Sequence, residues 1–269
     1  MSIILSTVIT HSYYKKYYHL LNSMNKNSPF INSCLCIDFV PSKDDMKKLP
    51  NINFIINKDY GNLIKKYKNE WTLNRNIYSP LHAGQFVNYN NYCDEDDDVV
   101  MFVDFDTTVQ REPNNDEKRF FGKIKTENNV FYAQLEKNCS LLQHCLDIDC
   151  MNLSEDEIKN LLPNIENYKA FNVGFYCSNR KNILNAYSYY EKLYMNNIDC
   201  FKTHESTQIL MLYVFQHYGN SLLECPVDMP NAHWYEPFYD RYEIKNDQFY
   251  VDDKLVLFMH DKFEKDLKY

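Results

Sequence analysis

The stretch that decides the fold is Asp97-Asp98-Val99-Val100-Met101-Phe102-Val103-Asp104-Phe105-Asp106. Its five consecutive apolar residues show no polar alternation, which predicts a short central strand covered on both faces of a sheet. The strand ends abruptly in two carboxylates separated by one residue. Ligands of open α/β sheets bind at the carboxyl ends of the strands, so Asp104 and Asp106 stand where a ligand site is expected.

The flanking sequence predicts that β and α units alternate along the chain. Short runs rich in branched and aromatic residues predict strands over residues 3–9, 33–39 and 52–56. Helical patterns over 13–24 and 76–92 separate them. This order is typical of an α/β fold with a Rossmann-like, mostly parallel central sheet flanked by helices.

The second half of the chain predicts both strands and helices. Ser154 and Glu157 form a capping box for a short helix, and residues 171–175 alternate as a strand does. Helical spacing follows over 183–194, and residues 209–218 are apolar enough for a buried helix. The chain ends in a predicted hairpin or late strand that spans residues 249–259.

Composition excludes several classes of protein. With 29 Lys and Arg against 37 Asp and Glu, the net charge is −8, which is the wrong sign for a chain that neutralises many phosphates, so no nucleic-acid partner is expected. The 9 cysteines include no Cys-x-x-Cys pair, which favours a reducing compartment. No stretch approaches the roughly 20 apolar residues of a membrane helix. We therefore expect a soluble, cytoplasmic protein without a membrane span.

The paired acids have a specific chemical use and a simpler alternative. Two carboxylates this close repel each other, and their hard oxygen atoms suit Mg²⁺ or Mn²⁺. Such a divalent metal can hold the two phosphates of a nucleotide and stabilise the charge that develops when the diphosphate leaves. The alternative is that Asp104 and Asp106 merely begin a polar loop.

The motif in its setting resembles the Asp-x-Asp motif of GT-A glycosyltransferases, which lies in the fourth strand about 100 residues from the start. Three further segments follow in the order found in family-8 (glycogenin and galactosyltransferase-like) enzymes. Residues 171–175 are similar to their Asn-x-Gly strand, 205–208 to their acidic-Gln pair, and 256–262 to their C-terminal His motif. The resemblance covers most of the chain.

The resemblance implies one GT-A-like domain over residues 1–269 with two halves that bind different substrates. Residues 1–110 would form the nucleotide-sugar half and 111–269 the acceptor-side half. The implied reaction moves a sugar from a nucleotide-diphosphate donor, a UDP-sugar, to the hydroxyl of a carbohydrate or glycosylated acceptor. The implied cofactor is a divalent metal, Mn²⁺ or Mg²⁺.

The same resemblance assigns roles to individual residues. The metal ligands would be Asp104, Asp106 and His260, and Glu205 is the catalytic candidate beside the reacting sugar carbon. The turn from Thr10 to Tyr14 would receive the nucleoside, and the other candidate donor contacts are Arg75, Asn172, Gly174, Gln208 and Lys262.

Structural alternatives stay open for several of these residues. Gly174 could mark a close backbone approach, and Glu205 could be an acid favoured by the helix dipole. His260 could be a hydrogen-bonded structural histidine, and Arg75 a surface charge. At the level of the whole protein, the rivals are a catalytically inert GT-A-shaped binding module and a sugar-nucleotide pyrophosphorylase. The second would need a glycine-rich loop after the first strand, and residues 6–12 hold no glycine.

Overall fold

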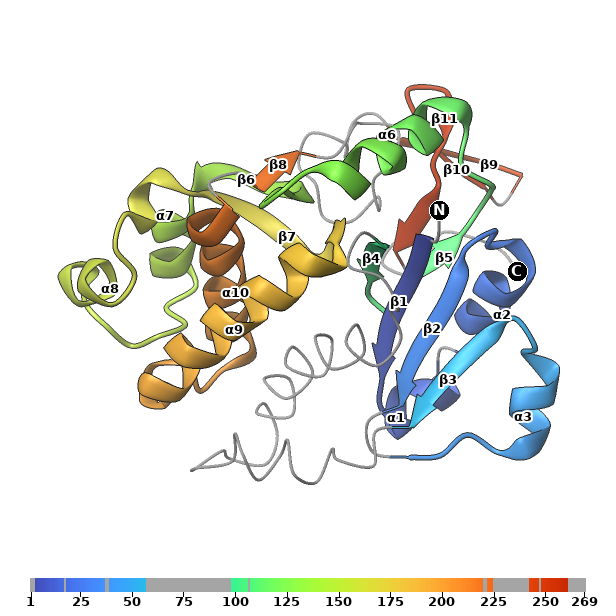
Figure 1. Ribbon diagram of the computed structural model, residues 1–269, viewed down its shortest axis with the longest axis horizontal. Coiled ribbons are helices and arrows are strands. Elements are labelled where there is room, and N and C mark those ends of the chain that lie inside the picture. The colour runs from blue at the N-terminus through green and yellow to red at the C-terminus, as the bar shows by residue number, and fades with distance from the viewer. Residues whose placement is uncertain are drawn as a thin grey trace.

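A computed structural model describes residues 3–16, 18–36, 39–56, 98–105, 107–219, 222–224, 242–246 and 248–260. Seven strands form the central sheet in the order β3-β2-β1-β4-β7-β6-β8 (Figure 1). These strands are β1 (Ile3–Ile9), β2 (Ile31–Cys36), β3 (Ile52–Ile56), β4 (Val99–Val103), β6 (Phe131–Ser140), β7 (Lys169–Asn179) and β8 (Leu222–Glu224). The sheet is mixed and mostly parallel, which confirms the expected α/β class.

The N-terminal half is the parallel part of the sheet. β1 pairs with both β2 and β4, and β2 pairs with β3, all in parallel. All five residues of β4 are buried, as its unbroken apolar run predicts. Because β1 and β4 are parallel neighbours, the residues that follow them, Thr10 and Asp104, lie at the same edge of the sheet.

β7 reverses the direction of the sheet at its centre. It runs antiparallel to β4 on one side and to β6 on the other. The pairing with β6 steps from Ala133 opposite Tyr176 to Gln134 opposite Asn172, so three residues of β7 have no partner on β6. This bulge keeps residues 173–175 out of the β6 ladder, at the point where β7 passes the end of β4.

Helices flank the sheet (Figure 1). They are α1 (His11–Lys16), α2 (Tyr18–Asn27), α3 (Lys43–Lys48), α6 (Asn115–Thr126), α7 (Leu141–Asp147), α8 (Glu155–Leu161), α9 (Arg180–Asn196) and α10 (His204–Gly219), with short 3₁₀ turns at Ile165–Asn167 and Ile198–Cys200. α9 packs beside α10, which is buried continuously from Ile209 to Gln216. This confirms the predicted buried helix. No described helix is long and apolar enough to cross a bilayer.

Two expectations about element boundaries need correction. The strand predicted over 33–39 is β2 at Ile31–Cys36, because its register with β1 already begins at Ile31 opposite Ile4. Phe39 lies beyond the strand, and its ring packs 4.9 Å from the ring of Tyr14. The helix predicted over 13–24 corresponds to α1 and α2, which begin at His11 and end at Asn27 on either side of residue 17, a position outside the described residues. The helix predicted over 76–92 also lies outside the described residues.

The C-terminal segment returns to the middle of the chain. β9 (Tyr242–Lys245), β10 (Gln248–Val251) and β11 (Lys254–Leu255) form a small antiparallel sheet, which includes the predicted hairpin. β12 (Phe258–His260) then leaves it and pairs antiparallel with β5 (Thr107–Val109). A short ladder between segments some 150 positions apart needs anchoring from elsewhere, because two-stranded ribbons are marginally stable alone.

Two consecutive side chains after β5, which we call the Gln110–Arg111 clamp, supply that anchoring. The Gln110 side chain accepts the amide of Phe249 at 2.8 Å, and its own amide donates to the carbonyls of Phe249 and Val256. Arg111 donates from Nε to the Leu255 carbonyl at 2.7 Å. The clamp thereby ties the β10–β11 hairpin to the start of α6.

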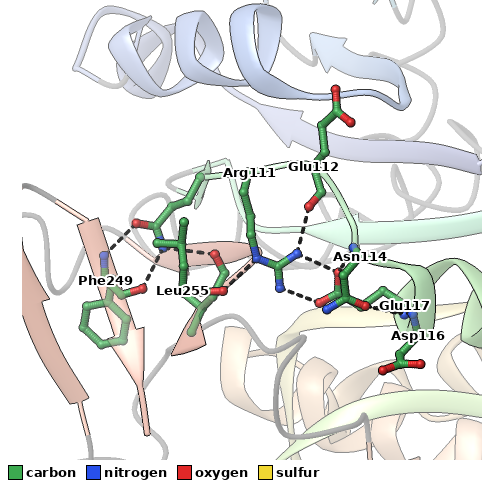
Figure 2. Close-up of polar contacts among 9 residues, drawn as sticks. Arg111, Glu112, Asn114, Asp116, Glu117, Phe249 and Leu255 are labelled. Carbon is green, nitrogen blue, oxygen red and sulfur yellow. Dashed lines mark hydrogen bonds and ion pairs between the residues drawn. The ribbon is translucent and has the colours of Figure 1, made fainter. Parts of the chain in front are cut away.

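A buried ion pair orients Arg111 in the clamp (Figure 2). Its two Nη atoms donate to the carboxylate of Glu117 at 2.7 and 2.6 Å. Glu117 also accepts the amide of Asn114 at 2.7 Å, and the Asn114 side chain caps α6 in return. Glu117 is 3% exposed, so its charge is compensated almost entirely by Arg111 and the helix start.

The clamp generates a prediction about stability. Glu117→Ala removes the capping-box acceptor and leaves the Arg111 charge without its partner in a mostly buried position. Breaking one side of a buried pair costs about 3–5 kcal/mol of unfolding free energy. Urea denaturation monitored by circular dichroism measures this loss.

Asp116→Ala is the matched control, because this neighbour on α6 is exposed and forms an ion pair with Arg119, which is also exposed. Exposed pairs contribute little, so this variant is expected to unfold close to the wild-type midpoint. Equal losses for Glu117→Ala and Asp116→Ala would contradict the role given to the ion pair.

Candidate functional site

Three predicted site residues come together where β4 ends against β7. A Cβ atom built on Gly174 would lie 2.6 Å from Oδ2 of Asp104 and 2.8 Å from Oδ1 of Asn172. The Asp104 carboxylate and the Asn172 amide therefore both stand directly over the glycine. No other residue type leaves room for both oxygen atoms in this position.

The strand register produces this arrangement. Val103 pairs with Phe175, so the next residue, Asp104, passes beside Gly174 and donates its amide to the Gly174 carbonyl at 2.9 Å. The Asp104 carbonyl in turn accepts the amide of Thr107 at 3.1 Å, which turns the chain sharply out of β4. Asp104 is half-buried at the carboxyl edge of the parallel strands.

The bulge in β7 places Asn172 against the glycine. Asn172 Oδ1 accepts the amide of Gly174 at 2.6 Å, a bond between residues two apart in the same strand. This local bond occupies a backbone donor in the bulge, where the β6 ladder is interrupted. Asn172 and Gly174 thus lie against each other and against Asp104, and their roles in donor binding stay predictions.

β12 carries His260 to the same neighbourhood. The β5–β12 ladder pairs His260 with Thr107, which follows Asp106 directly. The side chains of Asp106 and His260 lie outside the described residues, so their orientation stays a prediction. The Thr107 hydroxyl is buried, and among the described residues no hydrogen-bond partner for it is found.

The donor set suits a divalent cation. Asp104 offers a hard carboxylate oxygen, and the backbone pairing brings the His260 position next to that of Asp106. Within the part of the chain that the structure describes, no three His, Cys, Asp or Glu side chains form a complete metal cluster. The side chains of Asp106 and His260 lie outside the described residues, so the metal site stays a prediction.

The guanidinium nearest in sequence to the paired acids belongs to Arg111 in the clamp. Arg111 binds the Glu117 carboxylate and the carbonyls of Glu112 and Leu255 (Figure 2).

The residues after β1 lie at the same edge of the sheet. Thr10 is buried and its carbonyl accepts the amide of Tyr14 at 2.9 Å, which forms the first turn of α1. Tyr14 is 6% exposed, and its ring packs on Phe39 and Tyr18. Burial raises the pKa of Tyr14 well above its usual value. With both neighbours in place, its ring offers little free surface, and stacking on a nucleobase stays a prediction.

Glu205 and Gln208 lie in the first turns of α10, where Thr203 caps the helix by accepting the amide of Ser206 at 3.0 Å. Both side chains are half-buried. No described contact joins either of them to Asp104, so their roles also stay predictions. Arg75 and Lys262 lie outside the described residues.

Gln134 is a candidate that sequence reasoning missed. It pairs with Asn172 across the β6–β7 ladder and is 2% exposed. Neither the oxygen nor the nitrogen of its side chain has a hydrogen-bond partner among the described residues. A buried amide without hydrogen-bond partners costs about 1–3 kcal/mol of folding free energy. The buried Gln134 side chain beside the site is therefore a candidate for ligand binding. A polar residue inside an apolar run such as Phe131-Tyr132-Ala133 was the signal that could have found it.

Comparison with known proteins supports the fold. No protein-family model and no curated protein matches the sequence. Among solved structures, the chain is similar to a galactosyltransferase, LgtC, in complex with donor and acceptor sugar analogs (TM-score 0.55, 12% identity, 96% of this chain and 86% of that chain).

Two further solved structures give the same result. Mouse xyloside xylosyltransferase 1 in its apo form matches with a TM-score of 0.51, 12% identity and 97% coverage of both chains. The bifunctional glycosyltransferase WbbM matches with a TM-score of 0.54 and 14% identity, over 85% of this chain and 39% of that one. The chain therefore has the GT-A fold of these glycosyltransferases, as its motifs predict.

The contact between Asp104 and Gly174 generates a prediction. Gly174→Ala forces the Asp104 carboxylate and the Asn172 amide to move, which we expect to cost about 1–3 kcal/mol of unfolding free energy. In an Asp104→Ala background the cost should fall, because one of the two obstructing groups is gone. Urea denaturation of the four proteins in this cycle measures the coupling.

Gly122→Ala in α6 is the matched control, because a Cβ atom there meets nothing within 4 Å. It should stabilise the protein by up to about 1 kcal/mol, since alanine is the better helix former. Additive costs of Gly174→Ala and Asp104→Ala would contradict the packing described for the site.

Proposed function

We propose that this chain is a metal-dependent glycosyltransferase that moves a sugar from a nucleotide-diphosphate donor, a UDP-sugar, to an acceptor hydroxyl. One observation carries the proposal: Asp104 ends β4 directly over Gly174 and Asn172, beside the ladder that brings His260 next to Thr107. The GT-A fold supports it, because the matching structures that share this architecture are glycosyltransferases.

In this proposal Asp104, Asp106 and His260 hold Mn²⁺ or Mg²⁺. When bound, the metal neutralises the diphosphate and stabilises the charge that develops as it leaves. Lys262 and Arg75 add positive charge against the phosphates. The Gln110–Arg111 clamp serves this site indirectly, because it holds the hairpin from which the His260 strand continues.

The remaining residues bind and orient the substrates. Thr10 and Tyr14 follow β1, the neighbour of β4, and would receive the nucleoside at the shared edge. Asn172 and the bare backbone of Gly174 would line the sugar, because a glycine lets a ligand approach the strand closely. Glu205 is the candidate beside the reacting carbon, with Gln208 one turn further along α10.

Gln134 extends the proposed sugar site across the sheet. Its unpaired amide has one acceptor oxygen and two N–H donors, a set that matches the hydroxyls of a sugar. Its position opposite Asn172 continues the row of polar groups that starts at Asp104. A bound sugar would supply the hydrogen bonds that the described residues do not provide.

The central experiment measures nucleotide release from a panel of nucleotide sugars, with and without Mn²⁺. We expect turnover that depends on the metal and falls at least about 100-fold in Asp104→Asn and in Asp106→Asn, because losing a metal ligand removes several kcal/mol of charge stabilisation. Electron paramagnetic resonance of free Mn²⁺ should show weaker metal binding in the same variants.

Asp116→Asn, an exposed acid on α6, is the control and should leave both turnover and Mn²⁺ binding unchanged. Donor binding that is independent of metal, with no turnover across the panel, would instead identify an inert GT-A-shaped binding module. Full Mn²⁺ affinity in a folded Asp104→Asn variant would contradict the metal site.

Gln134→Leu tests the proposed sugar contact. The substitution removes an unpaired buried amide, so we expect unchanged or greater stability, together with a transfer rate at least 10-fold lower at subsaturating substrate. Thermal unfolding and initial-rate kinetics measure the two quantities separately.

Gln143→Leu on α7 is the matched control, since its side chain already donates to Asp147 at 2.7 Å and is exposed. It should not change the transfer rate. A large loss of stability in Gln134→Leu would show that its amide is satisfied within the protein, which contradicts a role in binding.

A further inference from the structure

Two cysteines outside the sheet-edge site lie in direct contact. Cys145 is in α7, and Cys150 follows the turn that ends this helix. Their Sγ atoms are 3.6 Å apart, and both residues carry free thiols. Cys145 is 1% exposed and Cys150 is 8% exposed.

The local backbone turns Cys150 back toward the helix. Ile148 donates its amide to the His144 carbonyl at 3.2 Å, and Asp149 takes a left-handed conformation with φ of 43°. This reversal sets the two thiols against each other across five positions. A disulfide places its sulfur atoms about 2.05 Å apart, so closure needs an approach of about 1.5 Å, within reach of side-chain rotation and a small backbone shift.

The pair contacts the beginning of α10. The Thr203 hydroxyl donates to the Cys150 carbonyl at 3.2 Å, and the same hydroxyl oxygen accepts the amide of Ser206 as the helix cap. The hydrogen bond with Cys145 and burial raise the pKa of the Cys150 thiol, and the charge of Glu205, in that first turn, adds to the increase. Cys150 is therefore connected to the helix start through a single side chain.

We propose that Cys145 and Cys150 are a dithiol that peroxide oxidises to an intramolecular disulfide, and that closure of this bond alters the first turn of α10. The disulfide draws Cys150 toward α7 and so weakens the bond that Thr203 makes to its carbonyl. This assigns a modification site that is separate from the residues at the end of β4.

The chemistry balances with one molecule of peroxide. The Cys145 thiolate attacks a peroxide oxygen, which gives a sulfenic acid and releases hydroxide that is protonated to water. The Cys150 sulfur then attacks the sulfenic sulfur, a second water leaves, and the S–S bond forms. Two electrons pass from the two sulfurs to the peroxide. The contact with the Cys150 thiol lowers the pKa of Cys145, which favours Cys145 as the first nucleophile.

A second cysteine pair in the same chain provides an internal comparison. Cys34 and Cys36 are alternate residues of β2, and the ladders to β1 and β3 hold their backbone extended. Both are fully buried, and the pKa of Cys34 is raised by its hydrogen bond to Cys36, in which Cys34 is the donor, and by burial. We therefore expect this pair to stay reduced.

The test oxidises the full-length protein with stoichiometric hydrogen peroxide under native conditions. Acid quenching, denaturation and alkylation then trap the remaining thiols. Cleavage before Asp147 separates the two cysteines, so a Cys145–Cys150 disulfide keeps two peptides joined at a mass two hydrogens below their sum. We expect this linkage to form first, while Cys34 and Cys36 are alkylated.

Amide hydrogen exchange of the oxidised protein tests whether the disulfide alters the first turn of α10. Amides of residues 204–208 should exchange at least several-fold faster than in the reduced protein, and dithiothreitol should reverse the change. Cys150→Ser and Cys34→Ser serve as variants: the first should abolish both effects and the second should change neither.

The proposal requires both results. It is overturned if Cys145 and Cys150 remain alkylated when the exposed thiols have reacted, if they pair with other cysteines, or if the disulfide forms with no change in exchange at the start of α10. The peptide map of the wild-type protein decides the first two outcomes, even where a cysteine variant does not fold.

Discussion

The antiparallel pairing of β4 with β7 is the constraint on which the rest of the structure depends. It joins the parallel N-terminal strands to the second half of the chain, and its register brings Asp104 beside Gly174. The space above Gly174 is filled by two side-chain oxygens. The lack of a Cβ atom at this position therefore allows the strands to pack and leaves room for the residues of the proposed site. A shift of the register by one residue would turn Asp104 to the other face of the sheet.

Polar side chains, not apolar burial alone, determine where the C-terminal segment docks. β10, β11 and β12 are too short to hold their positions by ladder bonds alone. Gln110 and Arg111 bind the backbone of the hairpin, and Glu117 holds Arg111 in one orientation. Buried ion pairs contribute modestly to net stability against apolar replacements, but they demand defined geometry. The defined geometry of the ion pair thus helps to fix the position of the segment whose last strand places His260 beside Thr107.

Some elements could be predicted closely and others could not, for physical reasons. The strands over residues 3–9, 52–56 and 99–103 were predicted with the observed bounds, because unbroken branched and apolar runs favour strands in any context. The first helical segment was predicted over 13–24, inside the bounds of α1 and α2, since periodicity does not reveal where a helix begins and ends. Gln134 could not be predicted from the sequence, because the residues that surround its side chain lie on β7, which is distant along the chain.

The sequence by itself determined the α/β class, the buried strand that ends in Asp104, and the oxygen and nitrogen donors available for a cation. These follow from local pattern and side-chain chemistry, which are properties of neighbours along the chain. Only the tertiary structure decided that Asn172 and Gly174 meet Asp104, that β12 returns to β5, and that Cys145 touches Cys150 at the cap of α10. Strand registers, bulges and returning segments depend on pairing energies between distant residues, and no local periodicity records them.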